Sequence, residues 1–271
     1  MQKQIVAPLV KEIISQSNYD INLKIEDFKQ LRELNTFLVS TNGSNKIKNI
    51  LIFLKDEQQL DDYENENELH FPLIVFLSKM TKTFNQKIPF NLFLDASVAE
   101  NFDICKTMAT TGNSCGMFIK KGTDIKWDLL EDLFDFSLKY NLPIEPFEYI
   151  LRHGTTRNKL PQLQYLYFNE PQTFLHFDYN GNYAFSMDDL EQAVYTGNVM
   201  SDSWEEINQK WTEKHMEEYS DFLDGHHCVS CESWRICKGV YYVNPNCSCR
   251  QLFLSIISQK NKDIDSKRKK K

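Results

Sequence analysis

The hydrophobic positions along the chain change their period several times before residue 170. Compact apolar runs bounded by charged or polar residues are typical of buried strands, whereas apolar side chains at steps of three and four predict helices. The runs of the first kind are 48–55, 88–97, 114–122, 143–152 and 160–168. The segments of the second kind are 71–84, 98–112 and 124–141. Strands that alternate with helices in this way predict an α/β fold with a parallel sheet or a partial barrel.

The pattern changes near residue 170, where we place a domain boundary. Two apolar runs surround Asn180-Gly181 in 173–189, and such a dipeptide predicts a hairpin whose two central residues accept positive φ. Residues 201–223 predict a helix, with Ser203 and Glu206 spaced as a capping box. A last helix is expected at 250–259, and the basic tail 260–271 is expected to be solvated and disordered.

Composition excludes some classes of protein. The chain has 271 residues, a formal net charge of −7 and a pI near 5.5, so a general nucleic-acid binder is disfavoured. No apolar run is long enough to span a membrane. The N-terminal residues 1–16 resemble the start of an amphipathic helix and lack the long apolar centre of a signal peptide. We therefore expect a cytoplasmic protein with reduced thiols.

The chemistry of the sequence is concentrated in its cysteines. Five of the seven lie within 22 residues, and they are Cys228, Cys231, Cys237, Cys247 and Cys249. The first three are spaced C-x2-C-x5-C, and clustered thiolates in a reducing compartment favour a metal. Four thiolates suit an iron–sulfur cluster or a tetrahedral zinc ion, and spacing does not separate the two. Buried free thiols or a disulfide are the remaining alternative.

The order of motifs around these cysteines resembles the SPASM domain, the auxiliary-cluster domain of many radical S-adenosylmethionine enzymes that modify ribosomally made peptides. The family has an Asp-x-x-Gly hairpin, a Gly-Asn dipeptide before a helix, and then the cysteine run. In this chain they correspond to Asp178–Gly181, to Gly197-Asn198 and to the run from Cys228, over roughly residues 173–255. The resemblance implies that Cys228, Cys231, Cys237 and Cys249 are metal ligands, with Cys247 as the alternative fourth.

The departures from the family concern one of its two clusters. Ser186 and Tyr241 stand where the family has cysteines, and no cysteine lies just before the hairpin. The ligands of the second cluster are all present, so the resemblance implies one [4Fe-4S] cluster, with zinc as the alternative.

The radical-generating motif C-x3-C-x2-C is absent before residue 170, where the only cysteines are Cys105 and Cys115. We expect these two to pack as small apolar side chains, and we expect no S-adenosylmethionine.

Together these features resemble the SPASM-domain peptide maturases that lack the radical motif, such as those of grasp-with-spasm systems. The implied organisation is a degenerate partial (β/α) barrel at 1–170, a small α+β SPASM-like domain at 171–259 and the tail. The implied role is that of a noncatalytic partner that binds a ribosomal precursor peptide, or a modifying enzyme such as an ATP-grasp ligase. A redox or electron-transfer enzyme and a zinc-stapled interaction module are the alternatives.

Overall fold

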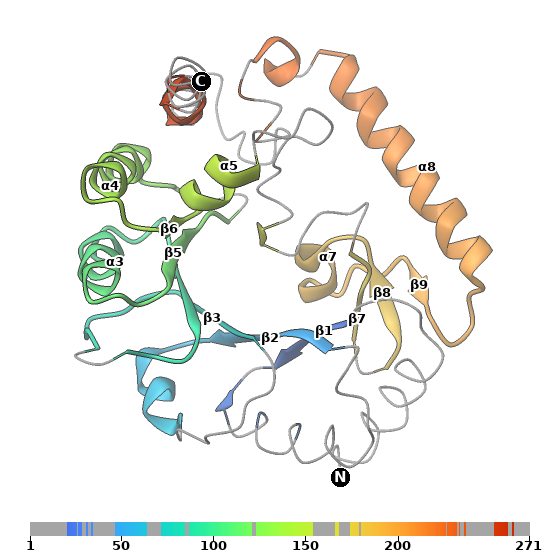
Figure 1. Cartoon of the computed structure of the whole chain (residues 1–271). Helices are drawn as coiled ribbons and strands as arrows, with labels where there is room; N and C mark the ends of the chain where they lie inside the picture. Colours follow the sequence, from blue (N-terminus) through green and yellow to red (C-terminus); the bar gives the residue numbers. More distant parts are fainter. Residues whose placement is uncertain are drawn as a thin grey trace, which may run out of the picture. The chain divides into compact units, whose positions relative to one another are not determined.

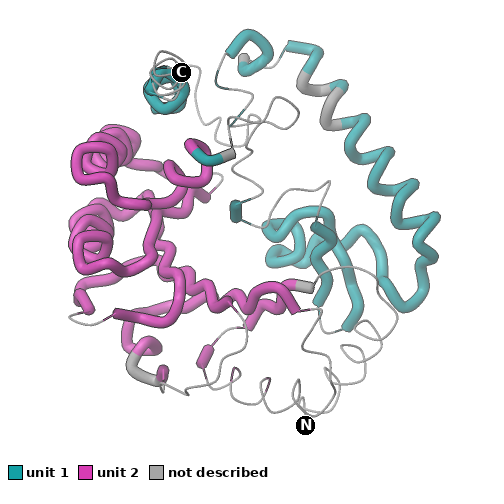
Figure 2. Tube along the Cα trace, viewed as in Figure 1, with its two compact units in different colours: residues 1–10, 152–271 teal, residues 11–151 magenta. Residues whose placement is uncertain are grey.

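The computed structural model divides into two compact units, one of residues 11–151 and one of residues 152–271 with 1–10 (Figures 1 and 2). We call them the sheet unit and the hairpin unit. The division falls about twenty residues before the change of pattern in the sequence. The residues that the structure describes are 21–25, 27, 28, 31, 34, 47–63, 72–84, 87–120, 123–153, 166, 167, 174–178, 180–225, 227–231, 233, 236, 252–259 and 262.

The sheet unit contains six parallel strands that lie side by side in the order of the chain. They are β1 Ile21–Ile25, β2 Ile47–Leu54, β3 Leu73–Leu77, β4 Asn91–Asp95, β5 Cys115–Phe118 and β6 Ile144–Glu145. Among the described residues, β1 and β6 are the two edges and do not pair with each other. The predicted α/β class is confirmed, and so are the strands expected at 48–55, 88–97 and 114–122.

The middle of this sheet is the core of the unit. All five residues of β3 are buried, and Phe76 stacks between Phe53 of β2 and Phe93 of β4, with ring centroids 4.5 and 5.3 Å apart. The prediction of helical character for 71–84 is therefore wrong. A strand that is covered on both faces carries an unbroken apolar run, and such a run also contains apolar residues at helical spacing.

Helices α3 (Glu100–Thr110) and α4 (Trp127–Tyr140) lie next to each other on the same side of the sheet (Figure 1). Both confirm predicted helices. Each ends at a residue with positive φ, Gly112 at 79° after α3 and Asn141 at 52° after α4, as helix C-termini commonly do. The short 3-10 helix η3 (Glu57–Asp62) follows β2.

The strand predicted over 143–152 is only two residues long and is followed by helix α5 (Phe147–His153), so most of that prediction is wrong. Pro146 has no N–H to donate to a ladder, which ends the strand. The Glu145 side chain then accepts a hydrogen bond from Tyr149 N at 2.9 Å, at the start of the helix. Gly116 of β5 faces Glu145 so closely that a Cβ there would lie 2.6 Å from the Glu145 Cβ.

A buried amide joins the carboxyl ends of two central strands. The fully buried Asn101 side chain donates to the carbonyls of Ser78 and Asp95, both at 2.9 Å, and accepts from Met80 N at 3.1 Å. These bonds satisfy backbone groups that would otherwise be buried without partners. The loops after β3 and β4 are therefore fixed by a single side chain of α3.

The hairpin unit contains a small antiparallel sheet in the order β7-β8-β9, one long helix and several short elements. They are β7 His176–Phe177, β8 Asn182–Ala184, α7 Met187–Glu191, β9 Gly197–Asn198, α8 Trp204–Leu223 and the 3-10 helix η4 His227–Ser230. Tyr183, Phe185 and Ile207 of α8 form a buried cluster beside Trp211. The predicted hairpin and the helix at 201–223 are confirmed.

The remaining predictions fall only partly within the described residues, or outside them. Residues 252–259 are helical, with Leu252, Phe253 and Ile256 buried, which confirms the last predicted helix over that range. The helix expected at 1–16, most of the strand expected at 160–168 and nearly all of the tail 260–271 lie outside the described residues. Within the described part of the chain, no helix has the length and apolar character needed to cross a membrane.

Candidate functional site

The hairpin at Asp178–Gly181 is organised by the Asp178 side chain. Its Oδ1 accepts hydrogen bonds from the backbone N–H groups of Asn180 at 2.8 Å and Asn182 at 2.9 Å. Gly181 N donates to the Asp178 carbonyl at 3.0 Å, and Gly181 has φ 83°. Asp178 N also donates to the Asn182 carbonyl at 2.9 Å, so the hairpin closes with a three-residue loop rather than a two-residue one. The positive φ of Gly181 agrees with the expectation, and that of Asn180 stays a prediction.

The Gly197-Asn198 dipeptide is hydrogen-bonded directly to this turn. The Asn198 side chain donates to the Asn180 carbonyl and to Asn182 Oδ1, both at 3.1 Å. Its own Oδ1 accepts from Met200 N at 2.9 Å. Motifs that are twenty residues apart in the sequence are therefore one hydrogen-bonded structure.

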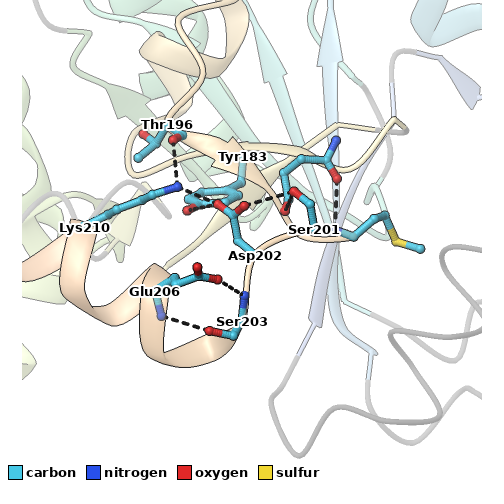
Figure 3. Close-up of polar contacts among 9 residues, drawn as sticks. Tyr183, Thr196, Ser201, Asp202, Ser203, Glu206 and Lys210 are labelled. Carbon is cyan, nitrogen blue, oxygen red and sulfur yellow. Dashed lines mark hydrogen bonds and ion pairs between the residues drawn. The ribbon is translucent and has the colours of Figure 1, made fainter.

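Gly197 makes room for a partly buried polar contact (Figure 3). A Cβ at this position would collide with Asp202 Oδ2 and would lie 2.8 Å from the Tyr183 ring and hydroxyl. The Tyr183 hydroxyl donates to Asp202 Oδ2 at 2.9 Å, and Lys210 Nζ of α8 donates to the same oxygen at 2.7 Å. Lys210 also reaches the Thr196 carbonyl at 3.5 Å, so this network joins the sheet to α8.

The protonation states of this network indicate a structural role. Hydrogen bonds from Lys210, Tyr183 and Ser201 lower the pKa of Asp202 to about 2. Burial, and then the Asp202 carboxylate, raise the pKa of Tyr183, and the Asp202 hydrogen bond raises the pKa of Lys210. A general acid or base works best with a pKa near the working pH, and all three groups are shifted away from neutrality. We interpret the three groups as a structural contact that holds β8 against α8.

Two further contacts position α8. Ser203 Oγ accepts from Glu206 N at 3.2 Å while the Glu206 carboxylate accepts from Ser203 N at 2.7 Å, which confirms the capping box (Figure 3). One helical turn after Lys210, Lys214 pairs with Asp189 of α7 at 2.7 Å. The acidic residues at the start of α7 thus act as helix-terminal and ion-pairing charges.

Helix α8 leads directly into the first two candidate ligands. Cys228 lies in η4, which packs against α8, and Cys231 N donates to the Cys228 carbonyl at 3.0 Å. Cys228 is buried and Cys231 is half-buried. Burial, together with the nearby Cys231 thiol, raises the pKa of Cys228. One tight turn therefore carries both thiols of the C-x2-C pair.

The rest of the predicted metal site lies beyond the part that the structure describes, because Cys237, Cys247 and Cys249 are outside the described residues. Elsewhere in the described ranges, no group of three or more His, Cys, Asp or Glu side chains could hold a metal ion. The convergence of the four thiolates stays a prediction.

Ser186, where the resemblance would place a ligand, caps a helix in this structure. Its Oγ accepts a hydrogen bond from Asp189 N at 3.1 Å and caps the first turn of α7. A serine hydroxyl is a preferred helix N-cap, so the residue contributes to the folding of α7.

The two cysteines of the sheet unit form a separate pair. Cys105 of α3 and Cys115 of β5 are buried, with sulfurs 3.7 Å apart. The hydrogen bond to Cys115, and then burial, raise the pKa of Cys105 well above its ordinary value. Buried thiols of this kind are poor nucleophiles, and they pack as the sequence predicted.

Sequence reasoning missed the Tyr183–Asp202–Lys210 network. Its members are 19 and 8 residues apart, and no local pattern joins them. The one available signal was Gly197, because a glycine within a short strand indicates a close approach of other atoms. No protein-family model, curated protein or solved structure gives a significant match to this chain.

Proposed function

We propose that this chain is an accessory protein in the maturation of a ribosomally synthesised peptide, with a degenerate radical-SAM-like partial barrel and a SPASM-like domain. The observation that carries the proposal is the bonded unit of Asp178–Gly181 and Gly197-Asn198, which continues through α8 to the Cys228–Cys231 turn. These are the motifs of the resemblance, in its order, and each has a physical part in one small domain.

The sheet unit also supports the proposal. In doubly wound proteins the strand order reverses within the sheet, whereas in (β/α) barrels successive parallel strands are added in chain order. The order β1 to β6 follows the second rule. Right-handed crossovers then place the connecting helices on one face, which is where α3 and α4 both lie.

The donor set fits a soft metal centre. Thiolates of Cys228, Cys231, Cys237 and Cys249 would hold a [4Fe-4S] cluster, which supplies a structural tie or a one-electron couple when bound. The turn places two of these donors on one ordered segment, and α8 and η4 contribute to the ordering of that part of the site. The Ser186 cap is consistent with the loss of the family's other cluster.

Metal analysis of the full chain tests the proposal. We expect about four iron and about four sulfide per chain after anaerobic purification, from the composition of a [4Fe-4S] cluster. Cys231→Ser should lose most of this metal, destabilise the hairpin unit and leave the sheet unit folded. Cys105→Ala is the matched control, because it removes a buried thiol from the other unit.

Three results would count against the proposal. One zinc without iron would favour the zinc-stapled module, and a reversible redox couple together with turnover of a substrate would favour the redox enzyme. Unchanged metal content in Cys231→Ser would contradict the ligand assignment. The role itself is tested by pull-down of the precursor peptide or ATP-grasp ligase encoded beside this chain, and failure to capture either would refute it.

A further inference from the structure

Exposed large apolar side chains lie close together in sequence on both sides of β9, one of the two edge strands of the small sheet. The described residues include eight exposed large apolar side chains, and four of them lie within eleven residues. These four are Val194, Tyr195, Met200 and Trp204, with exposures of 57, 46, 60 and 53%. We call them the β9 ridge. Scattered exposed apolar residues are normal on a protein surface, but a group at a strand edge indicates an interaction site.

The backbone of the ridge is fixed from both sides of β9. Thr196 N donates to the Tyr183 carbonyl and Val199 N donates to the Gly181 carbonyl, each at 2.8 Å. The Asn198 side chain holds Met200 N, and the Ser203 cap fixes the first turn of α8, where Trp204 lies. A surface whose backbone is already ordered loses little conformational entropy when a partner binds.

The segment that carries the ridge is acidic, and the cations that follow it in sequence, Lys210 and Lys214, are paired with Asp202 and Asp189. Residues 160–209 contain eight Asp and Glu residues and no Lys or Arg. Glu191, Glu205 and Glu206 are exposed and lie within a few residues of the ridge in sequence. Such a surface attracts cationic partners and repels nucleic acid and anionic membranes.

We propose that the β9 ridge binds an extended peptide segment that combines large apolar side chains with Lys or Arg. Its apolar side chains would cover Val194, Tyr195, Met200 and Trp204, and its cations would face the surrounding carboxylates. This inference deepens the proposed function by giving the peptide a binding surface, and it rests on that function only for the identity of the peptide.

The test uses the full chain and a fluorescein-labelled twelve-residue peptide of alternating lysine and valine. Fluorescence anisotropy should detect binding that weakens as salt increases, and a peptide with glutamate in place of lysine should not bind. The double variant Tyr195→Ser/Met200→Ser should raise the Kd about tenfold or more, because aromatic and Met anchors dominate such contacts. Glu205→Lys should also weaken binding.

A matched control separates this surface from general attraction to an acidic protein. Met216 and Leu223 of α8 are exposed to 62 and 54%, so Met216→Ser/Leu223→Ser removes similar apolar area elsewhere in the same unit. This control should leave the Kd within about twofold. Equal Kd values for the ridge variant, the control and the wild type would overturn the inference. Ridge-dependent binding to phosphatidylglycerol vesicles in place of the peptide would do the same.

Metal analysis of the same preparations keeps the two proposals distinct. The ridge variant should retain the metal content of the wild type. A wild-type protein without iron whose peptide binding still depends on the ridge would refute the proposed function and support the ridge. A protein with its cluster whose binding ignores the ridge residues would refute the ridge alone.

Discussion

Replacement of Gly197 by alanine adds a single methyl group at the point where β9, β8 and the start of α8 meet. The new Cβ would collide with Asp202 Oδ2 and lie 2.8 Å from both Tyr183 Cε1 and Tyr183 Oη. Gly197 does not have a positive φ, so alanine carries no backbone penalty there. The whole effect should therefore come from the clash.

The size of the penalty depends on whether the side chains that the new methyl group meets can move away. Tyr183 is fully buried, and Asp202 is held by Lys210 and Ser201, so neither side chain withdraws without loss of hydrogen bonds. Overpacking of a well-packed site costs about 1–3 kcal/mol. We expect the free energy of unfolding of the hairpin unit to fall by about this amount. Hydrogen–deuterium exchange should show it as faster exchange in β7–β9 and α8, with the sheet unit unchanged.

Two further variants make this reasoning refutable. Gly112→Ala tests backbone strain without a clash, because Gly112 has φ 79° and nothing within 4 Å of its Cβ position. Its effect should be confined to the sheet unit. In an Asp202→Ala background the penalty of Gly197→Ala should shrink, with a coupling energy of about 0.5 kcal/mol or more. An unchanged exchange rate in Gly197→Ala, or an undiminished penalty in that background, would show that the contact is not tight.

Three other outcomes are expected. Gly116→Ala should destabilise the sheet unit by at least about 2 kcal/mol, because the new methyl group would meet the backbone of Glu145, which moves less easily than a side chain. Denaturant unfolding measures this loss of stability. Ser203→Ala should cost about 1 kcal/mol through loss of the α8 cap, seen as faster exchange in its first turn. Asp202 has a folded pKa of about 2, below the ordinary 3.8, so its stabilisation is complete well above pH 3.8 and is lost as the pH falls through 2. Acid unfolding of Asp202→Asn should lack that part of the curve.

Local signals in the sequence predicted the local structure well. The helix at 124–141 was visible in its apolar spacing, and the capping box of Ser203 and Glu206 was visible in two residues. The hairpin followed from Asn180-Gly181, although the turn proved to be of another type. In each case the interactions that decide the structure lie within a few residues of one another.

Predictions that depended on distant partners were less successful. The run at 71–84 contains no signal for the two strands that flank β3, so its apolar spacing led to the wrong prediction of a helix. Pro146 changed a strand into a helix start within one apolar run. The contact of Tyr183 with Asp202 depends on how β8 pairs with β9, and the pattern of the sequence does not contain that register.

The strand order of the sheet unit has a consequence for synthesis of the protein. Each strand starts between 18 and 29 residues after the neighbour with which it pairs. Each strand can therefore pair with a neighbour that was synthesised shortly before it. Short sequence separation favours rapid folding, so the sheet can grow one strand at a time, from its first edge to its last, while the nascent chain emerges.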